Sequence, residues 1–127
     1  MSIFEDGLSK NQANFASLSP LSFLERTRKT FPNHTAIEYK DYTLTYQEAG
    51  LRCDALANLL INKKIISGNI IAVMLPNIPV MWECHFGIPM ALGVMNAINT
   101  RLDSNTVKFI LDHGEAKLFI YDSEYSE

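Results

Sequence analysis

The stretch from Ile70 to Arg101 constrains the fold more than any other part of the sequence. It predicts, in order, a strand, a turn, a helix and a second strand, at Ile70–Leu75, Pro76-Asn77, Ile78–Leu92 and Val94–Ile98. The first strand is a continuous apolar run, which is typical of a strand covered on both faces. Two strands joined by a crossover helix form a βαβ unit, so this stretch predicts a parallel sheet.

The helix expected at Ile78–Leu92 is apolar almost all round. Its strong polar residues are Glu83 and His85, and a helix of this composition is usually buried. The segment is also shorter than the roughly 20 residues that cross a bilayer, so we expect a core helix and no membrane span.

The chain before this unit predicts a helix, a hairpin and a second helix. Ser19-Pro20 is a helix start, with Ser19 as the cap. Thr35–Tyr39 and Tyr42–Thr45 alternate around Lys40-Asp41, which predicts two antiparallel strands. Thr45 and Glu48 have the spacing of a capping box, and the helix that they begin is expected to run to about Asn62.

The chain after Arg101 predicts one more helix and one more strand. Asp103 or Ser104 caps the helix, and Gly114 is expected in the left-handed conformation at its end. The strand is expected at Lys117–Tyr121. The fold class is therefore α/β: a mostly parallel sheet from βαβ units, with an N-terminal helix and an antiparallel β-hairpin. We expect residues 1–18 to be a flexible arm and residues 19–127 to be folded.

Composition and charge exclude several classes of function. The formal net charge of the 127 residues is −3 and the eleven basic residues are scattered, so we expect no nucleic-acid partner. Cys53 and Cys84 form no Cys-x-x-Cys pair and are expected to be buried free thiols. The N-terminus has no apolar signal segment, so a cytoplasmic protein is expected.

No familiar catalytic or phosphate-binding motif is present. The glycines, at 7, 50, 68, 87, 93 and 114, form neither a dinucleotide fingerprint nor a Walker loop. Nucleophile-elbow and zinc-protease motifs are also missing. We therefore assign no catalytic residue, no cofactor-binding residue and no metal ligand from motifs.

Three single residues remain as candidates. His85 lies beside Glu83 and Cys84, but neighbouring helical residues point about 100° apart and cannot converge on one ion, so a core or cap histidine is expected. Arg101 lies at the carboxyl end of a parallel strand, where open α/β sheets bind ligands, and is either a ligand contact, a surface salt bridge or a loop anchor. Asp122, after the last strand, is expected to cap a following helix.

Several segments together resemble the adenylate-forming (AMP-binding) acyl-CoA synthetases and ligases. These are Leu44–Glu48, Ile71–Asn77, Met90–Leu102 and His113–Lys117, and Ser19–Arg26 resembles the opening of the branch that acts on fatty and aromatic acids. The likeness runs in order from about Ser19 to Asp122. Leu92-Gly93 stands where that branch more often has Gly-Ala, so the tight exit of the helix is expected one residue later.

The resemblance implies a two-step reaction. ATP and a small-molecule carboxylic acid give an acyl-adenylate, and coenzyme A then displaces AMP, with Mg²⁺ offsetting the phosphate charge. The motifs that perform this chemistry lie downstream in such enzymes and are missing here, so the resemblance implies an incomplete, truncated part of a larger adenylation domain. We expect it to be inactive alone, to bind none of these cofactors tightly, and to self-associate through uncovered apolar faces. The alternatives are a non-catalytic binding module or split subunit with the same partial fold, and, on fold analogy alone, a small flavodoxin-like nucleotide binder.

Overall fold

The structure is a computed structural model that describes residues 7 and 17–126. Most of the arm expected at residues 1–18 lies outside the described residues. The elements follow in the order α1 (Pro20–Thr30), β1 (Thr35–Tyr39), β2 (Tyr42–Thr45), α2 (Tyr46–Asn62), β3 (Ile70–Met74), α3 (Pro79–Met90), β4 (Val94–Ala97), α4 (Ser104–His113), β5 (Leu118–Tyr121) and the short 3₁₀ helix η1 (Ser123–Tyr125).

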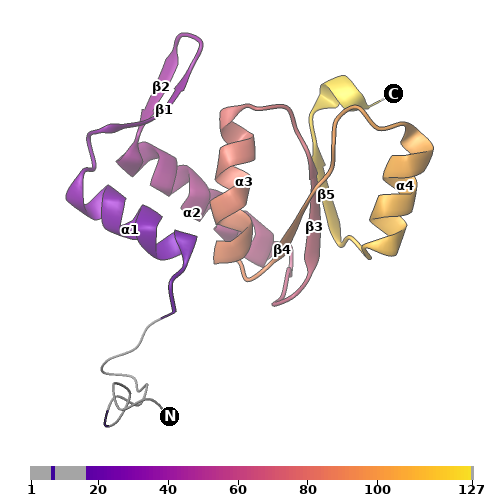
Figure 1. The fold of residues 1–127 in the computed structure, drawn as a ribbon, viewed down its shortest axis with the longest axis horizontal. Coiled ribbons are helices and arrows are strands. Elements are labelled where there is room, and N and C mark those ends of the chain that lie inside the picture. The colour runs from indigo at the N-terminus through magenta and orange to yellow at the C-terminus, as the bar shows by residue number, and fades with distance from the viewer. Residues whose placement is uncertain (1–6, 8–16, 127) are drawn as a thin grey trace.

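The strands form two separate sheets. β1 and β2 pair antiparallel as a hairpin, and β3 pairs in parallel with β4 on one side and β5 on the other. The hairpin projects from the end of the molecule that α1 and α2 form, while α3 and α4 lie on opposite faces of the parallel sheet (Figure 1). The expected α/β class, with its hairpin and parallel sheet, is confirmed.

Local signals determine where the helices begin. The Ser19 hydroxyl accepts the Leu21 amide at the start of α1, and Thr45 and Glu48 form the complete capping box of α2. Asp103 accepts the amides of Asn105 and Thr106 at the start of α4. The predicted helix starts at these three positions are confirmed.

Two predictions about helix ends are wrong. Gly114 is right-handed, with φ −79°, and its amide continues the α4 pattern by donating to the Ile110 carbonyl; Glu115, with φ 49°, makes the left-handed turn. Leu92, with φ 60°, makes the exit from α3, so this exit does not move to Gly93. Gly93 has a packing role instead, because a Cβ there would lie 2.5 Å from Cδ1 of Ile71.

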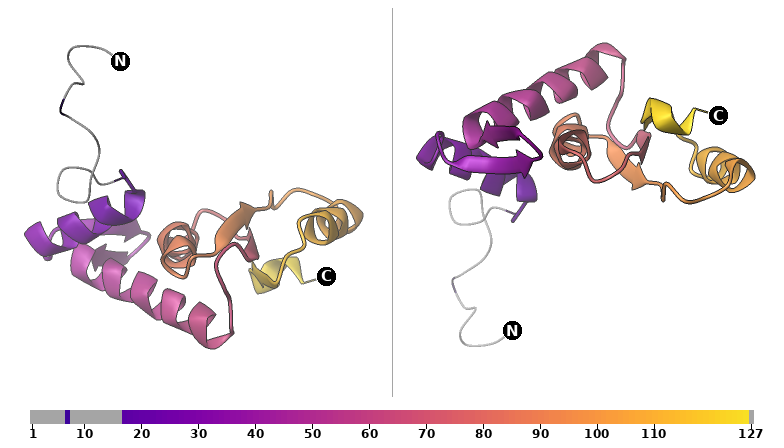
Figure 2. Two further views of the ribbon diagram at one scale, coloured as in Figure 1. Left: turned by 90° about the horizontal axis from the view of Figure 1, so that it is seen from below. Right: turned by 90° about the horizontal axis from the view of Figure 1, so that it is seen from above.

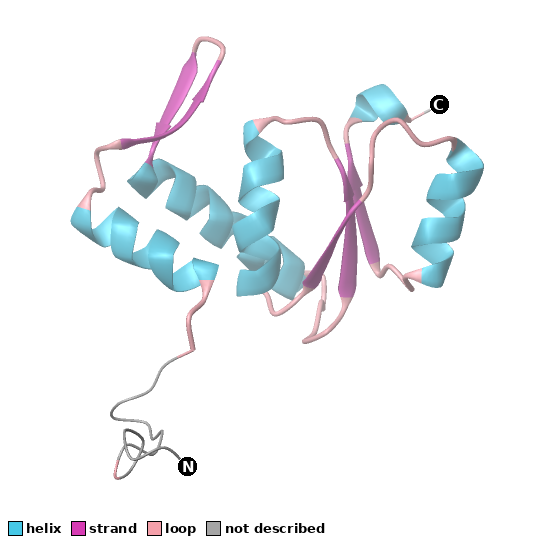
Figure 3. Ribbon diagram, viewed as in Figure 1, coloured by secondary structure: helices cyan, strands magenta, loops and turns pink. Residues whose placement is uncertain are grey.

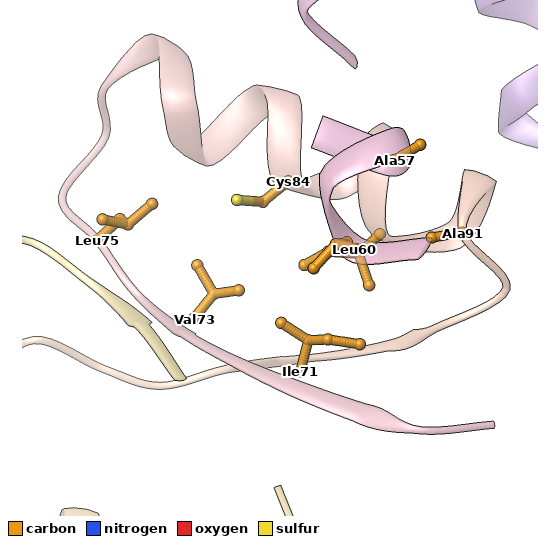
Figure 4. Packing of buried hydrophobic residues seen from close by; sticks show 8 residues of the cluster. Ala57, Leu60, Ile71, Val73, Leu75, Cys84 and Ala91 are labelled. Carbon is orange, nitrogen blue, oxygen red and sulfur yellow. The ribbon is translucent and has the colours of Figure 1, made fainter. Parts of the chain in front are cut away.

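The central strand β3 divides the core into two clusters. Ile71, Val73 and Leu75 point towards α2 and α3, where they meet Leu60 and Cys84 (Figure 4). Each fully buried aliphatic side chain in this cluster contributes about 2 kcal/mol of burial free energy. β3 is therefore covered on both faces, as its continuous apolar run predicts.

The second cluster lies on the opposite face of β3. Ala72 and Met74 meet Ile98 there, and the partly buried side chains of Val107 and Ile110 from α4 pack against them. Figure 2 shows α4 standing on this side, away from the α1–α2 end of the molecule.

α3 is less buried than its composition predicts. Cys84, Gly87 and Ile88 are buried against α2 and the sheet, whereas Met81 and Trp82 are half-exposed. The sequence of α3 is apolar all round, and α1 and α2 lie on one side of it and the parallel sheet on the other (Figure 3), but the part of its surface at His85 is left exposed. In the described part of the chain, no helix is both long and apolar enough to cross a membrane.

Candidate functional site

The carboxyl ends of the three parallel strands lie at one edge of the sheet. β3 leads there into Pro76-Asn77, β4 into Asn99-Thr100-Arg101 and β5 into Asp122 (Figure 1). Ligands of open α/β sheets bind at this edge, because the loops there are free to vary while the strands hold them in place.

Arg101 is exposed at this edge. Its backbone amide donates to Oδ1 of Asn99 at 3.0 Å, which holds the loop after β4, and its side chain forms no ion pair with a described residue. The backbone of Arg101 therefore acts as the loop anchor that was one of the alternatives. The ligand contact predicted for its guanidinium stays a prediction.

Asp122 has the structural role that the sequence predicts. Its carboxylate accepts the Glu124 amide at 3.1 Å and caps η1. This bond uses one carboxylate oxygen for a local turn, so Asp122 supports the end of β5.

The three adjacent residues Glu83, Cys84 and His85 diverge as expected. Glu83 is buried and accepts two bonds from the Arg52 guanidinium, of 2.5 Å from Nε and 3.3 Å from Nη2. Hydrogen bonding to Glu83 raises the pKa of Arg52 above its ordinary value. Among the described residues, no cluster of three His, Cys, Asp or Glu side chains could hold a metal ion.

The prediction for His85 itself is wrong. His85 is neither a core nor a cap histidine, because it lies in the middle of α3 and is exposed. Its Nδ1 lies 2.8 Å from the Met81 carbonyl, one turn earlier. The reason is that the burial of α3 is incomplete and leaves position 85 exposed.

A broad apolar hollow lies beside this part of α3. Its volume is about 780 Å³, and it lies between the hairpin, the start of α1 and the first two turns of α3. The side chains that give it its character are Ile37, Tyr39, Ile78, Met81, Trp82 and Phe86, with Glu38 and His85 as charged or titratable members. Sequence reasoning missed this hollow, although the apolar residues on every side of α3 were a signal that more than one face could be covered.

The two cysteines are buried, as predicted. Both thiols are free and have no exposed surface. Burial raises the pKa of Cys53 from 9.0 to about 12 and that of Cys84 to about 11. A thiol with such a pKa is almost wholly protonated at neutral pH and is a poor nucleophile.

A sequence model of AMP-binding enzymes matches residues 24–127. The chain is 43% identical over 122 residues to a peroxisomal trans-cinnamate:CoA ligase of Petunia hybrida. The aligned region covers 96% of this chain and 21% of that enzyme. It is 38% identical over 121 residues to a peroxisomal butyrate–CoA ligase of Arabidopsis thaliana, covering 95% of this chain and 21% of the enzyme. The chain thus spans about a fifth of the length of these relatives.

The fold matches solved structures as well. A fatty acyl CoA synthetase of Mycobacterium tuberculosis superposes with a TM-score of 0.80 at 24% identity, covering 84% of this chain and 22% of that one. The N-terminal subdomain of NpsA from Klebsiella oxytoca, in complex with 3-hydroxyanthranilyl-AMSN, superposes with a TM-score of 0.77 at 22% identity, covering 85% and 28%. Identities this low show a shared fold only. Together with the sequence match, they place the chain in the N-terminal part of the AMP-binding enzyme family, to which it belongs.

Proposed function

We propose that this chain is the N-terminal portion of an ATP-dependent ligase that joins a fatty or aromatic acid to coenzyme A through an acyl-adenylate. The observation that carries the proposal is the 43% identity, over nearly the whole chain, to a relative named as a cinnamate:CoA ligase. Other relatives at 38% identity are named as butyrate and benzoate ligases, which supports a carboxylic acid substrate and leaves its size open.

We propose that this chain alone does not form a complete site for ATP, Mg²⁺ or coenzyme A. The chain has no glycine-rich phosphate loop, and the described residues offer no group of carboxylates for a metal ion. No chemical step is therefore assigned to residues of this chain. We propose that the chain alone does not activate an acid, and that ATP, Mg²⁺ and coenzyme A bind to a longer polypeptide that contains it.

Acid-dependent exchange of pyrophosphate into ATP tests this proposal. The 127-residue chain is compared with a longer polypeptide read from the same gene, using cinnamate, benzoate, butyrate and a long-chain fatty acid. We expect no exchange from the chain alone and saturable exchange from the longer protein with at least one acid. Exchange by the chain alone would refute the claim of inactivity, whereas a longer protein that is inactive with every acid would refute the ligase assignment.

A non-catalytic interaction module is the second candidate. The observation that favours it is the well-packed core, because both faces of β3 are covered within the described chain. Such a module is expected to be a compact monomer. We propose instead that the chain self-associates, since large apolar side chains such as Phe23 and Phe109 are exposed at 56% and 65%.

The cellular compartment is a separate proposal. The sequence predicts a cytoplasmic protein, but relatives in two plant species are named as peroxisomal enzymes. We retain the cytoplasm as the proposal for this chain. Imaging of the longer protein with a fluorescent tag at its N-terminus tests this, and co-localisation with a peroxisomal marker would contradict it.

A further inference from the structure

We draw no further inference here: the strongest candidate, the apolar hollow between the β1–β2 hairpin, the start of α1 and α3, is open in a chain that spans about a fifth of the length of its relatives, and nothing in the structure shows what covers it.

Discussion

Leu92 shows how one residue can carry a conformation that suits its side chain poorly. Its φ of 60° is left-handed, and its side chain is 66% exposed, so little packing offsets the backbone strain. Gly93, which would accept this conformation easily, is instead held against Ile71, where only a hydrogen fits. The two residues thus divide the tasks of turning the chain and allowing close contact.

Replacing Leu92 by glycine is therefore expected to stabilise the chain. The change relieves the left-handed strain and should raise the free energy of unfolding in urea by about 1 kcal/mol, after the larger entropy of glycine in the unfolded chain is considered. Leu92→Ala is the matched control, since it removes the exposed side chain but keeps Cβ, and no gain is expected. An equal gain from both variants would show that apolar exposure, not backbone strain, is responsible.

At the scale of elements, the contact between α2 and α3 holds the two ends of the molecule together. Gly87 allows α3 to approach Leu56 of α2 so closely that a Cβ at position 87 would lie 2.8 Å from its Cδ2. Near this contact, Arg52 and Glu83 join the same helices, and the Glu83 side chain is only 7% exposed. A buried carboxylate of this kind destabilises the folded chain when its charged partner is removed.

Removal of Arg52 tests this dependence. Arg52→Met is expected to lower the free energy of unfolding by about 2 kcal/mol, less than for a fully buried pair because the Arg52 side chain is 45% exposed. Adding Glu83→Met should recover most of the loss, since no unpaired charge remains. Lys108→Met, whose partner Asp112 is exposed, is the control and should have a much smaller effect. Equal stability of the single and double variants would show that the pair is not coupled.

The elements that depend on neighbouring residues could be predicted from the sequence. The hairpin bounds and the capping box agree with the structure, because turns and caps are set by residues within about four positions. The errors at Gly114 and His85 have causes that the spacing of residues does not show. At Gly114 the cause is crowding around the end of α4, and at His85 it is the incomplete burial of α3. The strand order β4-β3-β5 and the Arg52–Glu83 pair could not be predicted either, because both depend on contacts between distant parts of the chain.

The candidate site was predicted less well than the fold. The carboxyl edge of the sheet and the cap at Asp122 follow from the βαβ pattern, and Arg101 lies where that pattern puts it. The hollow beside α3 could not be predicted from the βαβ pattern, because it depends on how the hairpin and α1 pack against a helix far along the chain.

At the scale of the whole molecule, the two thiols report on global unfolding. Cys53 and Cys84 lie at the contact between α2 and α3, and neither has exposed surface. Local fraying at the ends of the chain does not reach them. Their reactivity therefore depends on opening of the core.

The raised pKa values predict a loss of stability at alkaline pH. In the folded chain the pKa values of the thiols are about 12 and about 11, but in the unfolded chain they have their ordinary value of 9.0, so the unfolded state loses protons first. The contribution of the two thiols to stability is complete below pH 9 and is expected to fall as the pH rises from 9 towards 11. Urea titrations of the chain and of a Cys53→Ala, Cys84→Ala variant measure this, and the same alkaline slope in both would contradict the assignment to the thiols.

The position of β3 also determines the order in which the sheet can assemble. β3 is the central strand, yet it is the first of the three along the chain. Counted in residues from β3, its partner β4 is about half as far away as β5. Closing the shorter loop costs less entropy, so the β3–α3–β4 unit can form before β5 has joined. On a ribosome, the core of this fold would be paired on one side while its last strand was still being synthesised.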